Sequence, residues 1–439
     1  MKYIFYINIL ICFSSVTMSA QKAVTPKPGS DSLSLGVIIN KVISSYPSVL
    51  KAEQEIEYAN ARIGLAKSAY YPNVDLSASY SHIGPTSQIT IPEMGTFSLY
   101  PADNYSATLN YNQVLYDFGK TEKNVAMENL NKGLAKLSVE QLKQRLSINI
   151  AANYYSLLFL KEAIIIKNQE LANLNEHLLF VKKRAATGSA TDFEILTTSV
   201  RISNIENQKT DLLSSLQIQQ TLMNSFLGEP QNNNLVLMKD IKNEEITAPV
   251  DVLIASALSQ RDEIKIADQK GQISGLRSKI VDSQNNPSFS FFASGGLKNG
   301  YIPDLSVPKI NYAVGVGFKL PIFDAYRSKY SKVQVNAEIK STEADKELVK
   351  RGIINEIVEC RVNVEATFKK VKQSELQLMQ ASRAYSLAET SFKAGSLTNL
   401  DLLDSETALA ESRLFLMKTR IDYSLSLIKL KIALGERIY

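Results

Sequence analysis

Short segments of the chain alternate strictly between apolar and polar residues. Residues 74–82 read Val-Asp-Leu-Ser-Ala-Ser-Tyr-Ser-His, and residues 105–113 alternate in the same way. Residues 288–297 and 310–320 repeat the pattern. A period of two is typical of β-strands with one apolar and one polar face. The sequence therefore predicts two pairs of strands, with a loop over 83–104 between the first two.

Elsewhere the apolar residues follow a helical period. The predicted helices cover 33–70 (broken near Pro47), 119–184, 191–226, 250–284, 324–392 and 398–434. At ~1.5 Å per residue, the helix over 119–184 would be roughly 100 Å long. Its apolar stripe from Leu146 to Val181 advances by alternating steps of four and three, which is coiled-coil spacing. Helices of this length predict a long bundle rather than a globular domain.

The last helix carries two apolar stripes. One runs from Leu403 to Ile421 and the other from Tyr423 to Leu434. Two stripes on one helix predict neighbours on two sides, as in a ring of helices.

The whole arrangement occurs twice, with a constant offset of 207 positions (395 − 188 = 207). The corresponding pairs are Gly188 and Gly395, Thr191 and Thr398, Leu196 and Leu403, Gly228 and Gly435, and Asp117 and Asp324. Repetition on this scale indicates two copies of one structural unit that pack against each other. We therefore expect a first repeat over 33–228, a polar connection over 229–249 and a second repeat over 250–439.

The N-terminus has the features of a secretory signal peptide over residues 1–20. Lys2 supplies the positive start, an apolar core follows, and Met-Ser-Ala ends the segment. Residues 21–32 contain two prolines and a glycine, and predict an exposed lead-in. After cleavage Cys360 would be the one remaining cysteine, which excludes an internal disulfide. Its position in the middle of a predicted helix favours packing over nucleophilic chemistry.

Composition excludes several classes of function. A formal charge of +5 is too small to indicate nucleic-acid binding. The two histidines, His82 and His177, lack metal-ligand spacing, and no group of residues suggests catalysis or a cofactor. No apolar run of ~18 residues follows the signal peptide, so no transmembrane helix is expected. An enzyme is the least expected of the alternatives.

The strands and helices together predict an assembly of several copies. The apolar strand faces suit lipid and the polar faces suit a water-filled lumen. Four strands are too few to close a barrel, and an open sheet edge is not tolerated in a bilayer. Several chains must therefore share one barrel, with the long helices continuing it as a second, helical barrel.

At this point the chain resembles the TolC-type outer-membrane efflux proteins over its whole mature length. The local signatures are Pro-Ile-Phe-Asp at 321–324, Phe-Lys-Ala-Gly-Ser-Leu-Thr at 392–398, Leu-Asp-Leu-Leu-Asp at 400–404 and Ala-Leu-Gly at 433–435. The resemblance implies a mixed α and β membrane protein. It would be a trimer, with a shared twelve-stranded transmembrane β-barrel continuous with a periplasmic α-helical barrel.

The resemblance also implies a function and a location. Such a homotrimer is the passive exit duct of a tripartite efflux or type I secretion system in the outer membrane of a Gram-negative bacterium. Its partners would be outer-membrane lipid, a periplasmic adaptor (membrane fusion) protein and an inner-membrane pump of the RND, ABC or another class. The cargo could be drugs, metals or proteins. The alternatives are a periplasmic coiled-coil adaptor and a structural coiled-coil scaffold, neither of which needs the strand pairs.

The turns near 185–191 and 393–398 form the predicted tips of the helical hairpins. Thr191 with Glu194, and Thr398 with Asp401, fit capping boxes at helix starts. Asp404 lies beyond the first turn and is not needed for capping. Two interpretations of Glu194 and Asp401 remain open here. Each carboxylate fits a helix cap, and each also fits a position at the periplasmic entrance of such a duct.

The resemblance assigns roles to these tips. Asp401 and Asp404 match paired aspartates that ring the closed periplasmic entrance, with Glu194 close by. Relatives tie the closed tips with a Tyr and an Arg, which fall at Phe392 and Leu397, so the closed state here must rest on other contacts. The tip residues expected to meet the adaptor are Gly188, Thr191, Gly395 and Thr398.

Overall fold

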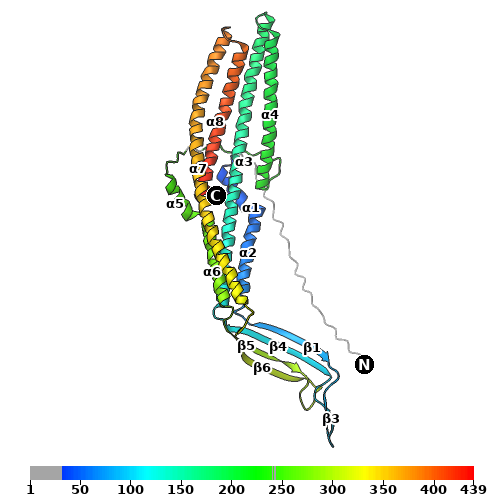
Figure 1. Cartoon of the computed structure of the whole chain (residues 1–439). Helices are drawn as coiled ribbons and strands as arrows, with labels where there is room; N and C mark the ends of the chain where they lie inside the picture. Colours follow the sequence, from blue (N-terminus) through cyan, green and yellow to red (C-terminus); the bar gives the residue numbers. More distant parts are fainter. Residues whose placement is uncertain (1–31, 240, 242–243) are drawn as a thin grey trace, which may run out of the picture.

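The structure is a computed structural model that describes residues 32–239, 241 and 244–439. The molecule is a long rod, in which the helices run side by side and the sheet lies beyond one end (Figure 1). The predicted signal peptide over 1–20 and nearly all of the lead-in over 21–32 lie outside the described residues. Among the residues described, no helix combines the length and the apolar character needed to cross a membrane.

The described helices reproduce the twofold repetition of the sequence. Their bounds are α1 Leu35–Ser45, α2 Pro47–Ser68, α3 Lys120–Ala186, α4 Asp192–Leu227, α5 Val250–Gln260, α6 Asp262–Asp282, α7 Arg327–Lys393 and α8 Asn399–Ala433. The two longest, α3 and α7, each contain 67 residues. Both their first and their last residues lie 207 positions apart (327 − 120 = 393 − 186 = 207). The offset read from the sequence therefore holds in the structure.

The prediction of one helix over 250–284 is wrong, because α5 and α6 are separated at Arg261. Its backbone is extended (φ −63°, ψ 135°), and its side chain forms ion pairs with Glu263 (2.8 Å) and with Glu356 of α7. In the first repeat, Tyr46 has nearly the same backbone geometry, ahead of Pro47 (φ −70°, ψ 128°). In the first repeat Pro47 marks the break between the two helices. In the second repeat the chain breaks at Arg261 without a proline.

The four predicted strands form one antiparallel sheet in the order β1-β4-β5-β6. Their bounds are β1 Asn73–His82, β4 Asp103–Tyr116, β5 Ser288–Lys298 and β6 Lys309–Lys319. The pairing of β4 with β5 joins the two repeats. Among the described residues, β1 and β6 are edge strands, with one side of each left unpaired.

The two faces of this sheet differ as the alternation predicts. One face exposes large apolar side chains, which include Val74, Leu76, Tyr80, Leu109, Ile310, Tyr312, Val314, Val316 and Phe318. On the other face the Asn110 amide donates to Asp75 (2.9 Å) and to Ser77 (3.0 Å). An exposed apolar surface of this size is typical of a face that contacts a membrane or another protein.

The segment 83–104 contains a hairpin where the sequence predicts only a loop. Strands β2 Gln88–Ile91 and β3 Gly95–Ser98 pair as a separate two-stranded sheet. The alternation Gln-Ile-Thr-Ile at 88–91 is short and is followed by Pro92 and Gly95, so the sequence did not indicate a strand here.

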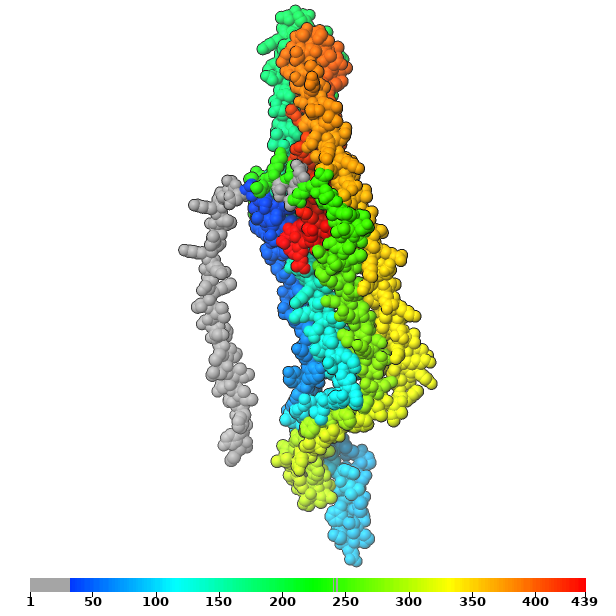
Figure 2. Space-filling model, turned by 90° about the vertical axis from the view of Figure 1, so that its left-hand side faces the viewer, coloured from blue at the N-terminus to red at the C-terminus, as the bar shows by residue number. Residues whose placement is uncertain are grey.

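The core follows the apolar stripes of the long helices. In α3 the residues Leu146, Ile150, Leu157, Leu160, Leu174 and Val181 are at most 7% exposed. Helix α8 has a buried stripe on each side, as predicted, because Met417 and Ile421 pack in one core cluster while Tyr423 and Leu427 pack in another. Figure 2 shows α1, α5 and the C-terminal end gathered around the middle of the rod.

Candidate functional site

The two helical hairpins end in turns at the end of the rod opposite the sheet (Figure 1). Gly188 and Gly395 have φ values of +73° and +77°, which L-residues with side chains rarely adopt. In the first turn the Ser189 amide donates to the Arg184 carbonyl (2.8 Å), and in the second the Ser396 amide donates to Ser391 (2.9 Å). The two tips are thus built by the same helix-ending motif.

Both predicted capping boxes are present. The Glu194 amide donates to Thr191 Oγ1 (3.3 Å), and the Thr191 amide donates to Glu194 Oε1 (3.4 Å). The Asp401 amide donates to Thr398 Oγ1 (3.2 Å), and the Thr398 amide donates to Asp401 Oδ2 (3.3 Å). Glu194 and Asp401 therefore each satisfy a helix start, whatever else they do.

Asp404 takes no part in capping but is not a free carboxylate. It forms an ion pair with Arg201 of α4 (2.6 Å), and its own side chain is 63% exposed. Sequence reasoning missed Arg201, which lies 203 residues away, since no local pattern links the two positions. Asp401 and Asp404 are both exposed on α8, but the charge of Asp404 is partly offset within its own chain.

Phe392 lies between the hairpins, only 3% exposed. Its ring centroid lies 5.1 Å from that of His177 and 6.0 Å from that of Phe180, and the Arg184 guanidinium lies 5.4 Å from it. Phe392 thus joins α7 to α3 through ring contacts. Leu397 is half-buried in the second turn.

The contact surface between α3 and α8 is called the seam here. At its apolar centre Leu174 of α3 and Leu403 of α8 meet Ile205 of α4, and all three are at most 3% exposed. At its tip end His177 Nε2 lies 2.5 Å from Asn399 Oδ1. Burial lowers the pKa of His177, despite the hydrogen bond with Asn399, so the ring is neutral at pH 7.

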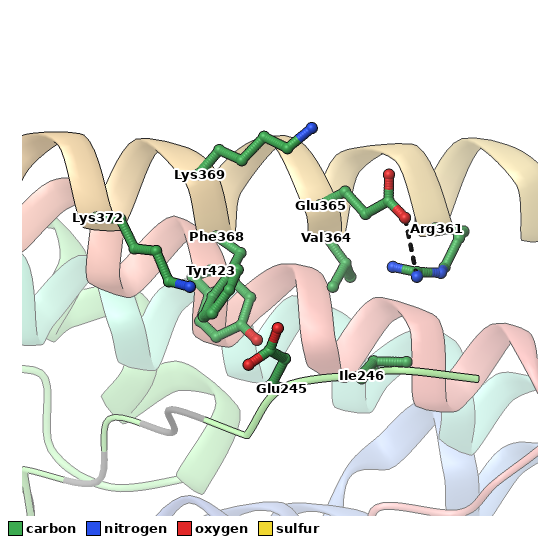
Figure 3. Close-up of a pocket in the computed structure, with 9 residues that line it drawn as sticks. All are labelled: Glu245, Ile246, Arg361, Val364, Glu365, Phe368, Lys369, Lys372 and Tyr423. Carbon is green, nitrogen blue, oxygen red and sulfur yellow. Dashed lines mark ion pairs between the residues drawn. The ribbon is translucent and has the colours of Figure 1, made fainter. Parts of the chain in front are cut away.

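A cavity of about 530 Å³ opens beside the seam, between α3, α7 and α8. A second, of about 360 Å³, lies near the middle of the rod (Figure 3). In Figure 3, Lys372 lies over the ring of Phe368 (4.2 Å), which in turn lies beside Tyr423 (5.4 Å between centroids). The Tyr423 hydroxyl donates to the Glu244 carbonyl, and this hydrogen bond anchors the segment that leads into α5 beside the second cavity.

No described group of three or more His, Cys, Asp and Glu side chains has the geometry to hold a metal ion. Cys360 is half-buried beside Glu356 and Glu359, and burial raises the pKa of its thiol. A thiol with a raised pKa is a poor nucleophile at neutral pH. The side chains described here can pack, cap helices and attract cations.

The family described as outer membrane efflux protein matches residues 38–229 and 253–436. Outer membrane protein TolC of Vibrio cholerae is 20% identical over 408 residues, which cover 91% of this chain and 90% of TolC. Alkaline protease secretion protein AprF of Pseudomonas aeruginosa is 21% identical, covering 92% of this chain and 85% of AprF.

Solved structures show the same fold. The crystal structure of the outer membrane protein VceC from Vibrio cholerae superposes with a TM-score of 0.76 at 19% identity, covering 92% of this chain and 97% of VceC. The family match takes in both repeats and thus most of the chain, which sets aside the adaptor and scaffold alternatives. The chain belongs to the outer membrane efflux protein family.

Proposed function

We propose that three copies of this chain form a passive exit duct across the outer membrane. A periplasmic adaptor would couple the duct to an inner-membrane pump of the RND, ABC or another class. The family supplies the outer-membrane location and the transport role. The relative AprF, named for secretion of alkaline protease, shows that protein export occurs among the similar chains.

One comparison within the chain carries the trimer proposal. Leu403 is 3% exposed because it is buried in the seam between α3 and α8. Its repeat counterpart Leu196, on α4, is 64% exposed. By the offset of 207, α7 and α4 correspond to α3 and α8. A ring of copies in which α7 packs on α4 of the next copy would therefore bury Leu196 as the seam buries Leu403.

The surfaces that would meet in such a ring are apolar on both sides. On α4 the exposed residues Phe193, Leu196 and Val200 lie on one helix face near the tip. On α7 the exposed residues Leu376, Met379 and Leu387 are spaced by three and eight, which also places them on one face. Pairing of these faces would close the helices into a barrel by coiled-coil packing.

The edge strands of the sheet also support an assembly of three copies. Edge strands β1 and β6 carry unpaired backbone groups, and these are not tolerated in lipid. Three chains with four strands each would close one barrel, and its exposed apolar face would meet outer-membrane lipid.

The tips would form the periplasmic end of the duct. Threefold symmetry would gather Asp401 and Asp404 around the axis as an entrance ring, with Glu194 beside it. Phe392 and Leu397 would support the closed state by packing. Gly188, Thr191, Gly395 and Thr398 would lie on the surface that meets the adaptor.

The test is the mass of the detergent-extracted protein by native mass spectrometry, together with export in a host that lacks its own copy of this gene. We expect a trimer that requires detergent and restores export. A stable monomer in buffer without detergent would refute the proposal.

A further inference from the structure

We propose that the cavity between α3, α7 and α8, here called the tip cavity, binds an organic cation. Its volume of about 530 Å³ lies in the range of small-molecule sites. Three aromatic rings and three carboxylates contribute to its wall: Phe180, Tyr385, Phe392, Glu176, Glu389 and Glu406. This combination suits a ligand with a positive charge on an apolar body.

Glu406 is the central observation. The residue is only 5% exposed, and its Oε1 atom is buried with no hydrogen-bond partner. An ionised carboxylate in this position is costly unless a proton or a cation neutralises it. Burial, reinforced by Glu170 and opposed by Asn173, raises the pKa of Glu406 to about 7. Arg201 acts on Glu406 from a distance and lowers its pKa, but no described cation forms an ion pair with it, so near neutral pH the cavity has an acidic group without a direct counter-charge.

Three of the neighbouring cations are already engaged in ion pairs. The charged and titratable groups around Glu406 and its cavity are Lys167, Glu170, Glu176, His177 and Arg184 of α3, Arg201 of α4, Tyr385, Glu389 and Lys393 of α7, and Arg413 of α8. Lys167 pairs with Glu170 (2.8 Å), Arg201 with Asp404 (2.6 Å) and Lys393 with Glu389 (2.7 Å). His177 is half-buried, and this burial lowers its pKa below the usual 6.5, so it adds little positive charge at pH 7. Glu176 and Glu406 form no ion pair within the described residues, so the nearby Arg184 and Arg413 leave both carboxylates without a direct counter-charge.

The electrostatic effect is already visible on a neighbouring side chain. Burial, together with Glu406, Glu389 and Glu176, raises the pKa of Tyr385 to about 12. Burial disfavours a charge of either sign, but the contribution of the three carboxylates, which disfavours a phenolate, favours a cation. The Arg184 guanidinium beside Phe392 shows that one of these rings already accepts a cation.

An organic cation fits better than a metal ion. The described residues hold no metal-ligating group of three, whereas rings supply much of the wall. The lining comes from both hairpins, since α3 belongs to the first and α7 and α8 to the second. A bound cation would hold the hairpins together. If the protein is the proposed duct, occupancy would favour its closed entrance.

The test is equilibrium dialysis of the detergent-solubilised full-length protein against radiolabelled benzyltrimethylammonium, whose charge does not depend on pH. We expect saturable binding at one site per chain. Glu406→Gln should weaken it at least about tenfold, the effect of losing one buried charge contact. Binding should strengthen from about pH 6 to pH 8 as Glu406 ionises, and this pH dependence should vanish in Glu406→Gln.

Matched variants separate the site from the fold. Glu411→Gln changes an exposed carboxylate of the same helix and should leave binding unchanged. Glu176→Gln should weaken binding less than Glu406→Gln, while leaving the buried wall intact. Benzylsulfonate, of similar size and opposite charge, should not compete.

Equal binding by the parent and Glu406→Gln, or displacement by benzylsulfonate, would overturn the site. Because the assay requires no export, such a result would leave the proposed duct standing. Loss of the trimer would instead contradict the duct and leave the binding data valid.

Discussion

Asp401 and Asp404 lie three residues apart on α8 but are held differently. The Asp401 carboxylate accepts from the Thr398 amide, so it belongs to a helix cap. The Asp404 carboxylate forms an exposed pair with Arg201. Removal of either carboxylate should therefore make the proposed entrance ring less negative, but the two removals should affect the stability of the fold differently.

We predict that Asp401→Ala lowers the free energy of unfolding by about 1 kcal/mol through loss of the cap. Asp404→Ala should cost less than Asp401→Ala, because many exposed ion pairs contribute nothing measurable to stability. Both should weaken the block of single-channel current by a trivalent cation added from the periplasmic side in a planar bilayer. If the double variant is blocked as strongly as the parent, the entrance lies elsewhere.

Arg201→Gln should act in the opposite direction. It frees the Asp404 carboxylate and removes a positive charge near the proposed ring, so a trivalent cation should block at a lower concentration. Lys209→Gln, at a half-buried position of the same helix, is the matched control. The same bilayer recordings measure both, and an unchanged block in Arg201→Gln would contradict the prediction.

At the scale of elements, one aspartate starts each of the long helices. Asp117 accepts from the Gly119, Lys120 and Thr121 amides ahead of α3, and Asp324 accepts from the Ser328 amide in α7. Burial raises the pKa of Asp117, but these hydrogen bonds and that from the Thr121 hydroxyl outweigh it, so the pKa lies below its usual 3.8. The pKa of Asp324 is lowered chiefly by the Ser328 side chain.

A lowered pKa in the folded state means that the ionised form stabilises it. We predict that Asp117→Ala lowers the free energy of unfolding by about 1 kcal/mol at neutral pH. Asp324→Ala, at an exposed carboxylate, should lower it in the same direction. The loss should shrink as pH falls from about 6 to about 2, because the parent carboxylate becomes protonated. Denaturant unfolding over this pH range measures it, with exposed Asp345→Ala as the control that should show no such trend.

The glycines of the tips yield a prediction about shape. A Cβ at Gly188 or Gly395 would meet no atom within 4 Å, so only the positive φ opposes a side chain. Gly395→Val should strain the turn by roughly 1–2 kcal/mol, keep the trimer and abolish export if the tip meets the adaptor. Gly352→Val, placed in open space within α7, should retain export. Normal export by Gly395→Val, or loss of its trimer, would count against this role.

Periodicity predicted most of these elements because each helix and strand is long and strictly patterned. The exceptions are local. The break at Arg261 depends on an ion pair with Glu356, 95 residues away, and the sequence around it carries no proline. The β2–β3 hairpin has strands of only four residues, too few for alternation to stand out.

At the scale of the whole molecule, Leu403 and Leu196 offer a matched comparison. Leu403→Ala empties part of the seam and should cost about 2–5 kcal/mol in the stability of each chain. Leu196→Ala should cost little in the isolated chain, since Leu196 is 64% exposed, but should weaken the trimer. Thermal unfolding and native mass spectrometry distinguish the two effects, and an undiminished trimer in Leu196→Asp would remove α4 from the interface.

The site was less predictable than the fold because its key contacts join the two repeats. The sequence indicated the capping boxes, since their partners lie three residues apart. It gave no sign of the pair between Arg201 and Asp404 or of the buried Glu406, because both depend on how one hairpin lies against the other.

The constant offset has a mechanical consequence for the proposed ring. Six hairpins would alternate around the axis, and so would the joints between them. Three joints lie inside a chain and are fixed by Leu403, Phe392 and the contact of His177 with Asn399. The other three join separate chains. There Leu196 keeps the leucine of Leu403, but Ala185 stands in place of Phe392, and Ala384 and Asp192 stand in place of His177 and Asn399. The three joints between chains would therefore separate more easily than the three joints within chains. The entrance would open with threefold rather than sixfold symmetry.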